Sequence, residues 1–440
     1  MDVPGAKRAS PRHGRSRFFT RRKCLAAFVV LALLPGGCQF FFRKIGGDFR
    51  GPPSEMWSAL SPGARALIAR AHEGIDSDTL ADFHVHVVGL GKGGSGIYLN
   101  PDWLSIWHPF KRARTEVYIS ASGIDVTSET ADREYIVRFA ELARAVAGHG
   151  KYHLLAFDYH YRPDGTRDLD RTSFAVPNEY VVSLAEEFPD VFVPVVSVHP
   201  YRLDALEELE KWARKGCRFV KWLPNAMGID PSNDRTFPFY EKMKALDMVL
   251  LCHTGHELSV DAEHQDLGNP LLLRTALDAG VTVVAFHAGS RGEYVDLDDP
   301  EKRHASALDL FFRLMDDPRY EGRLFGEISA TTFSINLDAP LRRILEREDL
   351  QHRFVNGSDY PLPAINVVTR TGKLASLGFI TDEERSQLDE IYGYNPLLFD
   401  FVLKRTLRHP ESGKRLRPTV FQVPPELRRP WPPVTRPVKR

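Results

Sequence analysis

The stretch Asp82-Phe83-His84-Val85-His86 decides how the rest of this chain is interpreted. It lies within an apolar run, residues 80–88, that predicts a β-strand. Side chains two positions apart on a strand face the same side. We therefore expect Asp82, His84 and His86 to project together, while the two apolar residues between them pack against helices. Two histidines on one face of one strand form half of a metal site.

Seven further apolar runs follow, each separated from the next by an amphipathic stretch. Equivalent positions near the ends of the last five runs lie 32 to 40 residues apart, the room that one strand, one helix and two loops require. The eight predicted strands are residues 80–88, 152–158, 191–199, 217–223, 248–254, 281–287, 324–329 and 353–359. Such a chain closes most naturally into a barrel, which predicts the α/β class and a distorted (β/α)8 TIM barrel over residues 79–400.

The long gap after the first predicted strand is interpreted as an insertion over the barrel mouth. It contains a glycine-rich loop, a segment with Trp103 and Trp107, and a predicted helix near residues 131–147. Residues 117–120 are an alternative strand, which would change the strand numbering but not the ligands. Before the barrel, residues 38–78 form a helical lead-in, with a helix over residues 53–73 and Ser54 as its cap.

The first 37 residues have the pattern of an export signal. A basic run ending Arg21, Arg22, Lys23 precedes eleven uncharged, mostly apolar residues, too few to cross a bilayer as a helix. The arginine pair resembles a twin-arginine signal, and residues 34–38 resemble a lipobox ending at Cys38, so lipidation of Cys38 and simple cleavage both stay open. We expect export to a bacterial periplasm or anchoring as an envelope lipoprotein.

Charge is unevenly distributed, although 58 basic residues balance 58 acidic ones over the 440 residues. Basic residues concentrate in residues 1–23 and 401–440, which leaves an acidic body and argues against nucleic acid as its partner. Residues 401–440 are basic and proline-rich, and predict a solvated, extended tail, with a weak contact to anionic lipid as the alternative. The oligomeric state stays unknown. Cys217 and Cys252 are expected to be buried thiols.

Polar groups suited to metals follow the later predicted strands. Each stands after an apolar run and before a turn, and in a barrel these positions meet on one catalytic face. With the two histidines of the opening stretch, the candidates are His84, His86, Lys221, His253, His287 and Asp359.

At this point the sequence resembles the metal-dependent amidohydrolase superfamily, and more closely its amidohydrolase-related branch. The resemblance covers residues 80–400, including the closing segment with Tyr394, Asn395 and Pro396. It implies one of two metal arrangements. In the first, a carboxylated Lys221 bridges two ions, one bound by His84, His86 and Asp359, the other by His253 and His287. In the second, His84, His86, His253 and Asp359 bind one ion, and His287 contacts its water.

An ammonium group beside a divalent cation is repelled, so Lys221 must be neutral, carboxylated or turned away. Pairing with a substrate carboxylate is a third role, and the bridging carbamate is favoured slightly. Nitrogen and oxygen ligands without cysteine suit zinc, and manganese, iron or nickel almost as well. Asp359 is the candidate proton carrier between the attacking water and the leaving group.

Weaker candidates stand near the same strand ends. Substrate contacts are expected for His199, Glu327, Asn225 and Arg291. Other positions that could line the mouth, cap a turn or bind an anionic group are Asp158, His160, Asp230, His256, Glu257 and Ser290.

The sequence thus predicts a metal-dependent hydrolase that activates water on one or two divalent ions to cleave an amide, ester, lactone or related bond of a small molecule. One alternative is a metal-dependent nonoxidative decarboxylase of an aromatic or enol acid. Another is a non-catalytic envelope lipoprotein that binds a ligand. The specificity loops do not identify the substrate.

Overall fold

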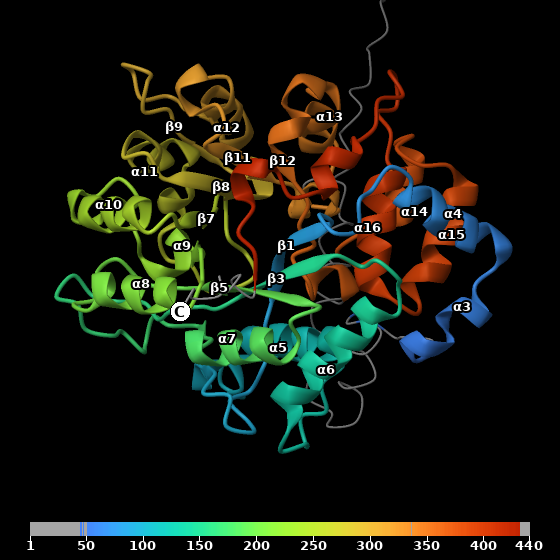
Figure 1. Ribbon diagram of the computed structural model, residues 1–440, viewed down its shortest axis with the longest axis horizontal. Helices are drawn as coiled ribbons and strands as arrows, with labels where there is room; N and C mark the ends of the chain where they lie inside the picture. Colours follow the sequence, from blue (N-terminus) through green and yellow to red (C-terminus); the bar gives the residue numbers. More distant parts are fainter. Residues whose placement is uncertain (1–44, 46, 48–50, 336, 432–440) are drawn as a thin grey trace, which may run out of the picture.

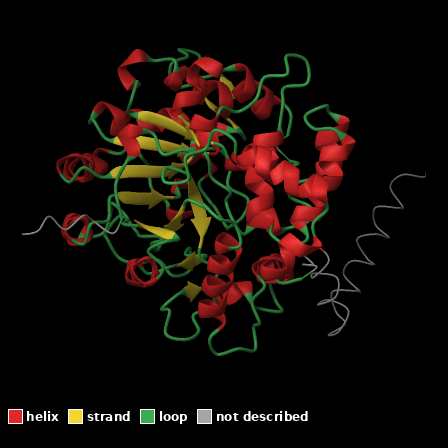
Figure 2. Ribbon diagram, turned by 45° about the vertical axis from the view of Figure 1, so that its right-hand side comes forward, coloured by secondary structure: helices red, strands yellow, loops and turns green. Residues whose placement is uncertain are grey.

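The computed structural model describes residues 45, 47, 51–335 and 337–431. Eight parallel strands form a nearly closed barrel with one unsealed seam, in the order β1-β3-β5-β6-β7-β8-β11-β12, and helices surround it (Figures 1 and 2). The predicted signal peptide and Cys38 lie outside the described residues. Over the described part of the chain, no helix is both long and apolar enough to cross a bilayer.

The barrel strands confirm all eight predicted runs. Each strand is shorter than its predicted run, although His86, Lys221, His253 and Glu327 still lie within their strands. The strands are β1 (Ala81–His86), β3 (Lys151–Leu155), β5 (Phe192–Val196), β6 (Phe219–Trp222), β7 (Val249–His253), β8 (Thr282–Phe286), β11 (Leu324–Glu327) and β12 (Phe354–Val355). Small antiparallel pairs flank them: β2 (Tyr98–Leu99) with β4 (Phe174–Ala175), and β9 (Glu293–Val295) with β10 (His304–Ser306).

The seam between β12 and β1 is closed by the chain that follows β12. The amide of Phe83 donates to the carbonyl of Asn356 (2.9 Å), and the amide of Asp359 donates to the carbonyl of His84 (2.8 Å). The amide of His86 donates to the carbonyl of Tyr360 (2.9 Å), beside an isolated parallel bridge between Val85 and Tyr360. The seam therefore brings the last predicted ligand, Asp359, beside the first two.

Amphipathic helices cover the outside of the barrel. In α8 (Ala205–Arg214), for example, Leu209, Trp212 and Ala213 are buried against the strands. The other helices after β4 are α7 (Asn178–Glu187), α9 (Pro224–Met227), α10 (Phe237–Ala245), α11 (Arg274–Asp278), α12 (Ala307–Met315), α13 (Ala339–Glu346), α14 (Thr371–Ser376), α15 (Asp382–Tyr392) and α16 (Pro396–Thr406). The two predicted thiols, Cys217 and Cys252, are buried and free.

The insertion after β1 contains α5 (Pro109–Ser122) and α6 (Ala131–Arg144). The helix predicted near residues 131–147 is confirmed, but the alternative strand at residues 117–120 is wrong. Those residues lie inside α5, which starts with Pro109 at its first turn and ends at Gly123 in the left-handed conformation. The buried carboxylate of Asp132 accepts the amides of Leu90, Gly91 and Lys92, and so ties the glycine-rich loop to α6.

The lead-in is helical, but its cap differs from the prediction. A short helix, α3 (Met56–Ala59), is followed by α4 (Pro62–His72), and the Ser61 hydroxyl accepts the amide of Ala64. Ser61 and not Ser54 is therefore the cap, because Pro62 pre-sets the first turn of α4.

The predicted solvated tail is corrected for its described part. Residues 401–406 complete α16, and the segment after it first contacts α13 and α15 through Arg408, His409 and Glu411 (Figure 1, red). Further along, Gln422 and Val423 pair with the chain just before β1. Leu427 is fully buried in the barrel interior with Phe83, Phe219 and Val249. The composition suggested solvent exposure, but the apolar residues between the prolines close the lower end of the barrel.

Replacing Leu427 by Ala should destabilise the protein by about 2–5 kcal/mol, because it opens a cavity in the barrel interior. Urea unfolding measures this loss. The neighbouring Glu426 is exposed, so Glu426→Ala should change stability by less than about 0.5 kcal/mol. Equal effects of the two substitutions would contradict the packing of this segment.

Candidate metal centre and its pocket

Three of the predicted ligands converge at the seam. The Nε2 atoms of His84 and His86 lie 3.0 Å apart. The Oδ1 atom of Asp359 lies 3.3 Å from Nε2 of His84 and 3.0 Å from Nε2 of His86. Two lone-pair nitrogens and a carboxylate oxygen therefore occupy the corners of a small triangle, and these three residues could hold a metal ion.

The size of this triangle fits a small divalent ion. Nitrogen and oxygen ligands at about 2.0–2.1 Å from a tetrahedral zinc ion are about 3.3 Å from one another. The three observed separations, 3.0 to 3.3 Å, are close to that edge length. A second possible group, His84, His287 and Glu327, is fully buried, whereas His86 in the first group is half-buried.

The remaining predicted ligands line the same pocket. All six candidates, His84, His86, Lys221, His253, His287 and Asp359, are among its lining residues. The ring of His287 lies 4.8 Å from that of His253 and 5.1 Å from that of His84, centroid to centroid. Six side chains from β1, β6, β7 and the loops after β8 and β12 therefore meet at one face.

Burial keeps the imidazoles neutral. It lowers the pKa of His84, His253 and His287 well below the usual value, and the positive charge of Lys221 adds to this effect at each. Neutral imidazole is the form that binds metals. Burial also lowers the pKa of Lys221 to about 8, and its ammonium nitrogen lies 3.9 Å from the centre of the Phe286 ring.

Two of the candidate ligands have an unusual backbone conformation. His287 and Asp359 have φ angles of 64° and 59°, in the left-handed region that residues other than glycine rarely adopt. Both follow the last residue of a strand closely, where this turn aims the side chain back across the barrel mouth. Backbone of this kind is retained where the surrounding structure fixes it, and it clusters at functional sites.

Glu327, a predicted substrate contact, does not line the pocket and lies against two of the histidines. Its carboxylate is fully buried and lies 3.1 Å from Nδ1 of His84. It also accepts the Ser329 hydroxyl (2.8 Å), while Nδ1 of His287 lies 2.8 Å from that hydroxyl. Holding Nδ1 presents Nε2 to the pocket. Burial raises the pKa of Glu327 to about 8. Ser329, two residues after Glu327, was missed, although period-two alternation would place it on the same side.

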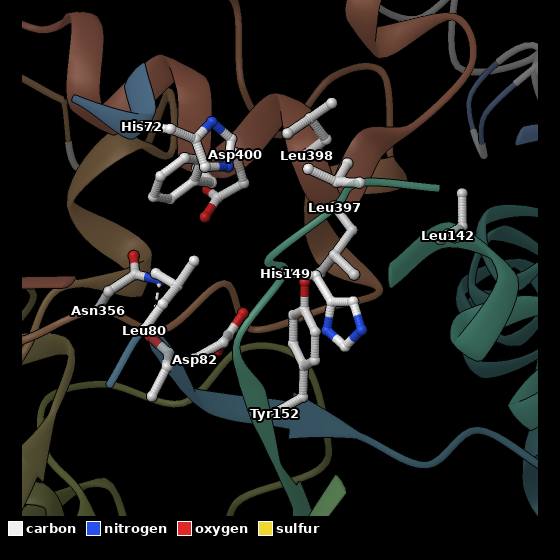
Figure 3. Close-up of a pocket in the computed structure, with 13 residues that line it drawn as sticks. His72, Leu80, Asp82, Leu142, His149, Tyr152, Asn356, Leu397, Leu398 and Asp400 are labelled. Atoms are coloured by element: carbon white, nitrogen blue, oxygen red, sulfur yellow. Dashed lines mark hydrogen bonds between the residues drawn. The ribbon is translucent and has the colours of Figure 1, made fainter. Parts of the chain in front are cut away.

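Asp82 does not face the cluster, contrary to the prediction. The register of β1 shifts between Asp82 and Val85, so the period-two argument fails there. The Asp82 carboxylate accepts the amides of His84 and Ser358. Together with Asp400 it points into a small cavity of about 30 Å³ between β1, β3 and α16 (Figure 3). Burial raises the pKa of Asp82 to about 6.

A buried ion pair supports the loop that carries Asp359. The Lys404 ammonium donates to the Asp400 carboxylate and to the carbonyl of Gly357, both at 2.6 Å. A Cβ atom at Gly357 would lie 2.4 Å from the Glu327 carboxylate and 2.8 Å from Cβ of His84, so only glycine fits. Lys404 was counted with the basic tail, because its burial depends on the packing of α16.

His199 and Asn225, two predicted substrate contacts, do not line the pocket. The ring of His199 lies 2.9 Å from the Met227 carbonyl and accepts the Tyr201 amide (3.1 Å). Asn225 is buried and donates to the Gly255 carbonyl (3.1 Å). Both stabilise loops behind the pocket.

The other weak candidates divide into two groups. Asp158 accepts the His199 amide and pairs with Arg202 (3.1 Å). Asp230 accepts the amide and hydroxyl of Ser232, as in a turn. These two and His160 lie outside the pocket, whereas its walls include Arg291, His256, Glu257 and Ser290. The Glu257 carboxylate lies 3.5 Å from Nδ1 of His253.

Acid should destabilise the fold through His199. Burial lowers its pKa to about 3, whereas the unfolded chain titrates near 6.5. Between these values the unfolded state binds a proton that the folded state rejects, so stability falls as pH decreases from about 6.5. Urea unfolding between pH 7 and 4.5 measures the change of the unfolding free energy with pH. His199→Gln should make this change smaller by up to about 1.4 kcal/mol per pH unit. The exposed control His108→Gln should keep the wild-type dependence; a wild-type dependence in His199→Gln would refute the assignment.

Lys404→Met should cost about 3–5 kcal/mol, because Asp400 is left buried without its partner. The double variant Lys404→Met/Asp400→Leu should recover most of that stability but bind zinc more weakly than wild type, since Gly357 is no longer held. Urea unfolding and competition with a zinc chelator measure the two effects. Wild-type zinc affinity in the double variant would show that Lys404 only neutralises Asp400.

Comparisons with known proteins identify the family of this chain. The sequence profile described as Amidohydrolase matches residues 81–397. No curated protein matches. Among solved structures, a putative 2-pyrone-4,6-dicarboxylic acid hydrolase from Pseudomonas putida is 16% identical, with 74% of this chain and 98% of that chain covered and a TM-score of 0.38. A probable 2-pyrone-4,6-dicarboxylic acid hydrolase from Acinetobacter baumannii is 14% identical, with 72% of this chain and 100% of that chain covered and a TM-score of 0.39.

The profile match spans most of the chain, and the chain belongs to the amidohydrolase family of enzymes.

Proposed function

We propose that this enzyme is a metal-dependent hydrolase of a small molecule. The observation that carries the proposal is the meeting of six metal-competent side chains in one pocket, three of them with ligand atoms 3.0 to 3.3 Å apart. His84, His86 and Asp359 would hold a divalent ion, with zinc as the first choice for such ligands. When bound, this ion supplies a Lewis acid and a water whose pKa is about 7.

Asp359 is the proposed proton carrier. Its Oδ1 atom faces the two imidazoles, so the second oxygen is the one assigned to take a proton from the attacking water and return it to the leaving group. His287 is assigned to the same water from the other side, because the Ser329 hydroxyl at its Nδ1 fixes the ring orientation. Glu327 holds His84 in the same way.

The chemical state of Lys221 decides whether the proposed site holds one ion or two. Its pKa of about 8 makes the neutral amine, the form that adds carbon dioxide, accessible near neutral pH. Its place on β6 between the histidine-bearing strands supports a bridging carbamate, with His253 and His287 at the second ion. The other assignment is a contact to a substrate carboxylate.

Export, and a lipid anchor at Cys38, remain part of the proposal. The charge pattern of residues 1–23 and the sequence of residues 34–38 support them. A contact of the C-terminal segment with anionic lipid gains no support, because Arg405, Arg408 and Arg415 donate to protein groups or pair with Glu384.

Metal content tests the proposal directly. Elemental analysis of the purified enzyme should find one or two zinc-type ions per chain, and none in His84→Ala/Asp359→Asn. Lys221→Ala should lower a count of two to one or none, whereas an unchanged single ion would support the one-ion form. His256→Ala, at the pocket wall, should keep the wild-type count. Full metal content in the double variant would refute the assigned ligands.

A further inference from the structure

The pocket above the metal centre is large for a site built around a few polar groups. Its volume is about 770 Å³, towards the upper end of the range of about 300–1,000 Å³ for ligand pockets. The six metal-competent side chains are a small part of its lining. A small polar substrate would leave most of this volume unfilled, so the walls indicate what the remainder accommodates.

The walls are mainly apolar and come from several elements. Trp103 and Val117 belong to the insertion after β1, Phe157 and Phe174 follow β3, and Phe333 follows β11. Arg114, one of the charged side chains in the lining, is paired with Asp261 (2.5 Å). The other charged residues outside the metal-competent cluster are Glu257, Arg291, Arg370 and Lys373. An apolar wall of this kind contributes favourably to the free energy of binding only when a ligand displaces water from it.

The apolar character continues to the surface. Leu258, Ile335 and Val367 line the pocket and are 50%, 65% and 46% exposed. Residues 104–110, which join two lining segments, carry Leu104, Ile106, Trp107 and Phe110, each more than half exposed. Exposed apolar side chains that gather at the mouth of a pocket indicate a binding surface, whereas single apolar side chains scattered over a surface do not.

We propose that the substrate is an amphiphile: a hydrolysable polar group at the metal centre, joined to a long or bulky apolar part that lies along the pocket wall and reaches its mouth. This deepens the proposed hydrolase function and rests on it for the chemical step. The binding part stands on the shape and chemistry of the pocket alone.

Two sources can supply such a molecule, the bilayer or free solution. Ile45 lines the pocket, and its carbonyl accepts the amide of Asn366 (2.8 Å). Seven residues of fully extended chain span at most about 25 Å. If Cys38 is lipidated, as proposed above, the pocket mouth therefore stays within about that distance of the membrane surface.

Binding of two fluorescent probes of different chain length tests the proposal. The probes are 6-(dansylamino)hexanoate and 11-(dansylamino)undecanoate, titrated into the metal-loaded enzyme below their micellar concentrations. Each buried methylene should tighten binding about two- to fourfold, so the longer probe should bind at least about tenfold more tightly. Equal affinities would overturn the proposal.

Variants at the mouth locate the apolar part. Leu258→Asp/Val367→Asp changes exposed residues and should fold normally, but it should weaken the long probe at least about tenfold and the short probe much less. Leu203 is also exposed and does not line the pocket, so Leu203→Asp should leave both affinities within about twofold. A matching loss in this control would overturn the assignment.

The readouts separate the two proposals and the two sources. Tight binding of the long probe by an enzyme that hydrolyses no ester, amide or lactone would refute the hydrolase and keep the amphiphile pocket. Transfer of the long probe from phosphatidylglycerol–phosphatidylcholine vesicles at a rate that rises with vesicle concentration supports the bilayer source. A rate independent of vesicle concentration supports uptake from solution.

Discussion

The candidate metal centre depends on how the barrel closes. β1 and β12 share no continuous ladder among the described strands, and the seam is closed by a few backbone hydrogen bonds, among them the one from Asp359 to the carbonyl of His84. That bond joins two predicted ligands that are 275 positions apart in the chain. It fixes the left-handed turn at Asp359, which in turn places the carboxylate within 3.3 Å of both imidazoles.

Beneath this seam lies a layer of buried charge. Glu327, Asp82 and Asp400 are buried carboxylates, and Lys404 is the buried cation that faces them from α16. Buried charges of this kind contribute little net stability, because their desolvation offsets their attraction. They act by positioning other residues, because they hold His84, Gly357 and the loop to Asp359 in one arrangement. The candidate ligands are therefore supported by contacts from the C-terminal helix α16.

The long insertion and the C-terminal segment complete the two ends of the barrel. Between β1 and β3, α5 and the segment before it provide much of the apolar wall above the metal centre. The last part of the described C-terminal segment, residues 420–431, closes the opposite end, with Leu427 inside the barrel. The enzyme therefore has metal-competent side chains and apolar walls in one pocket, and a closed opposite end of the barrel.

The sequence by itself determined the eight strands, their order and the residues at their carboxyl ends, because strand periodicity and spacing are local properties. Those positions meet in any barrel, so the six metal-competent residues could be predicted from spacing and resemblance.

Only the tertiary structure decided the rest. The shift in β1 turned Asp82 away from the pocket, and His199 and Asn225 found partners behind the wall. Lys404, Ser329 and the apolar tail residues have roles that depend on contacts between distant segments, which no local pattern records.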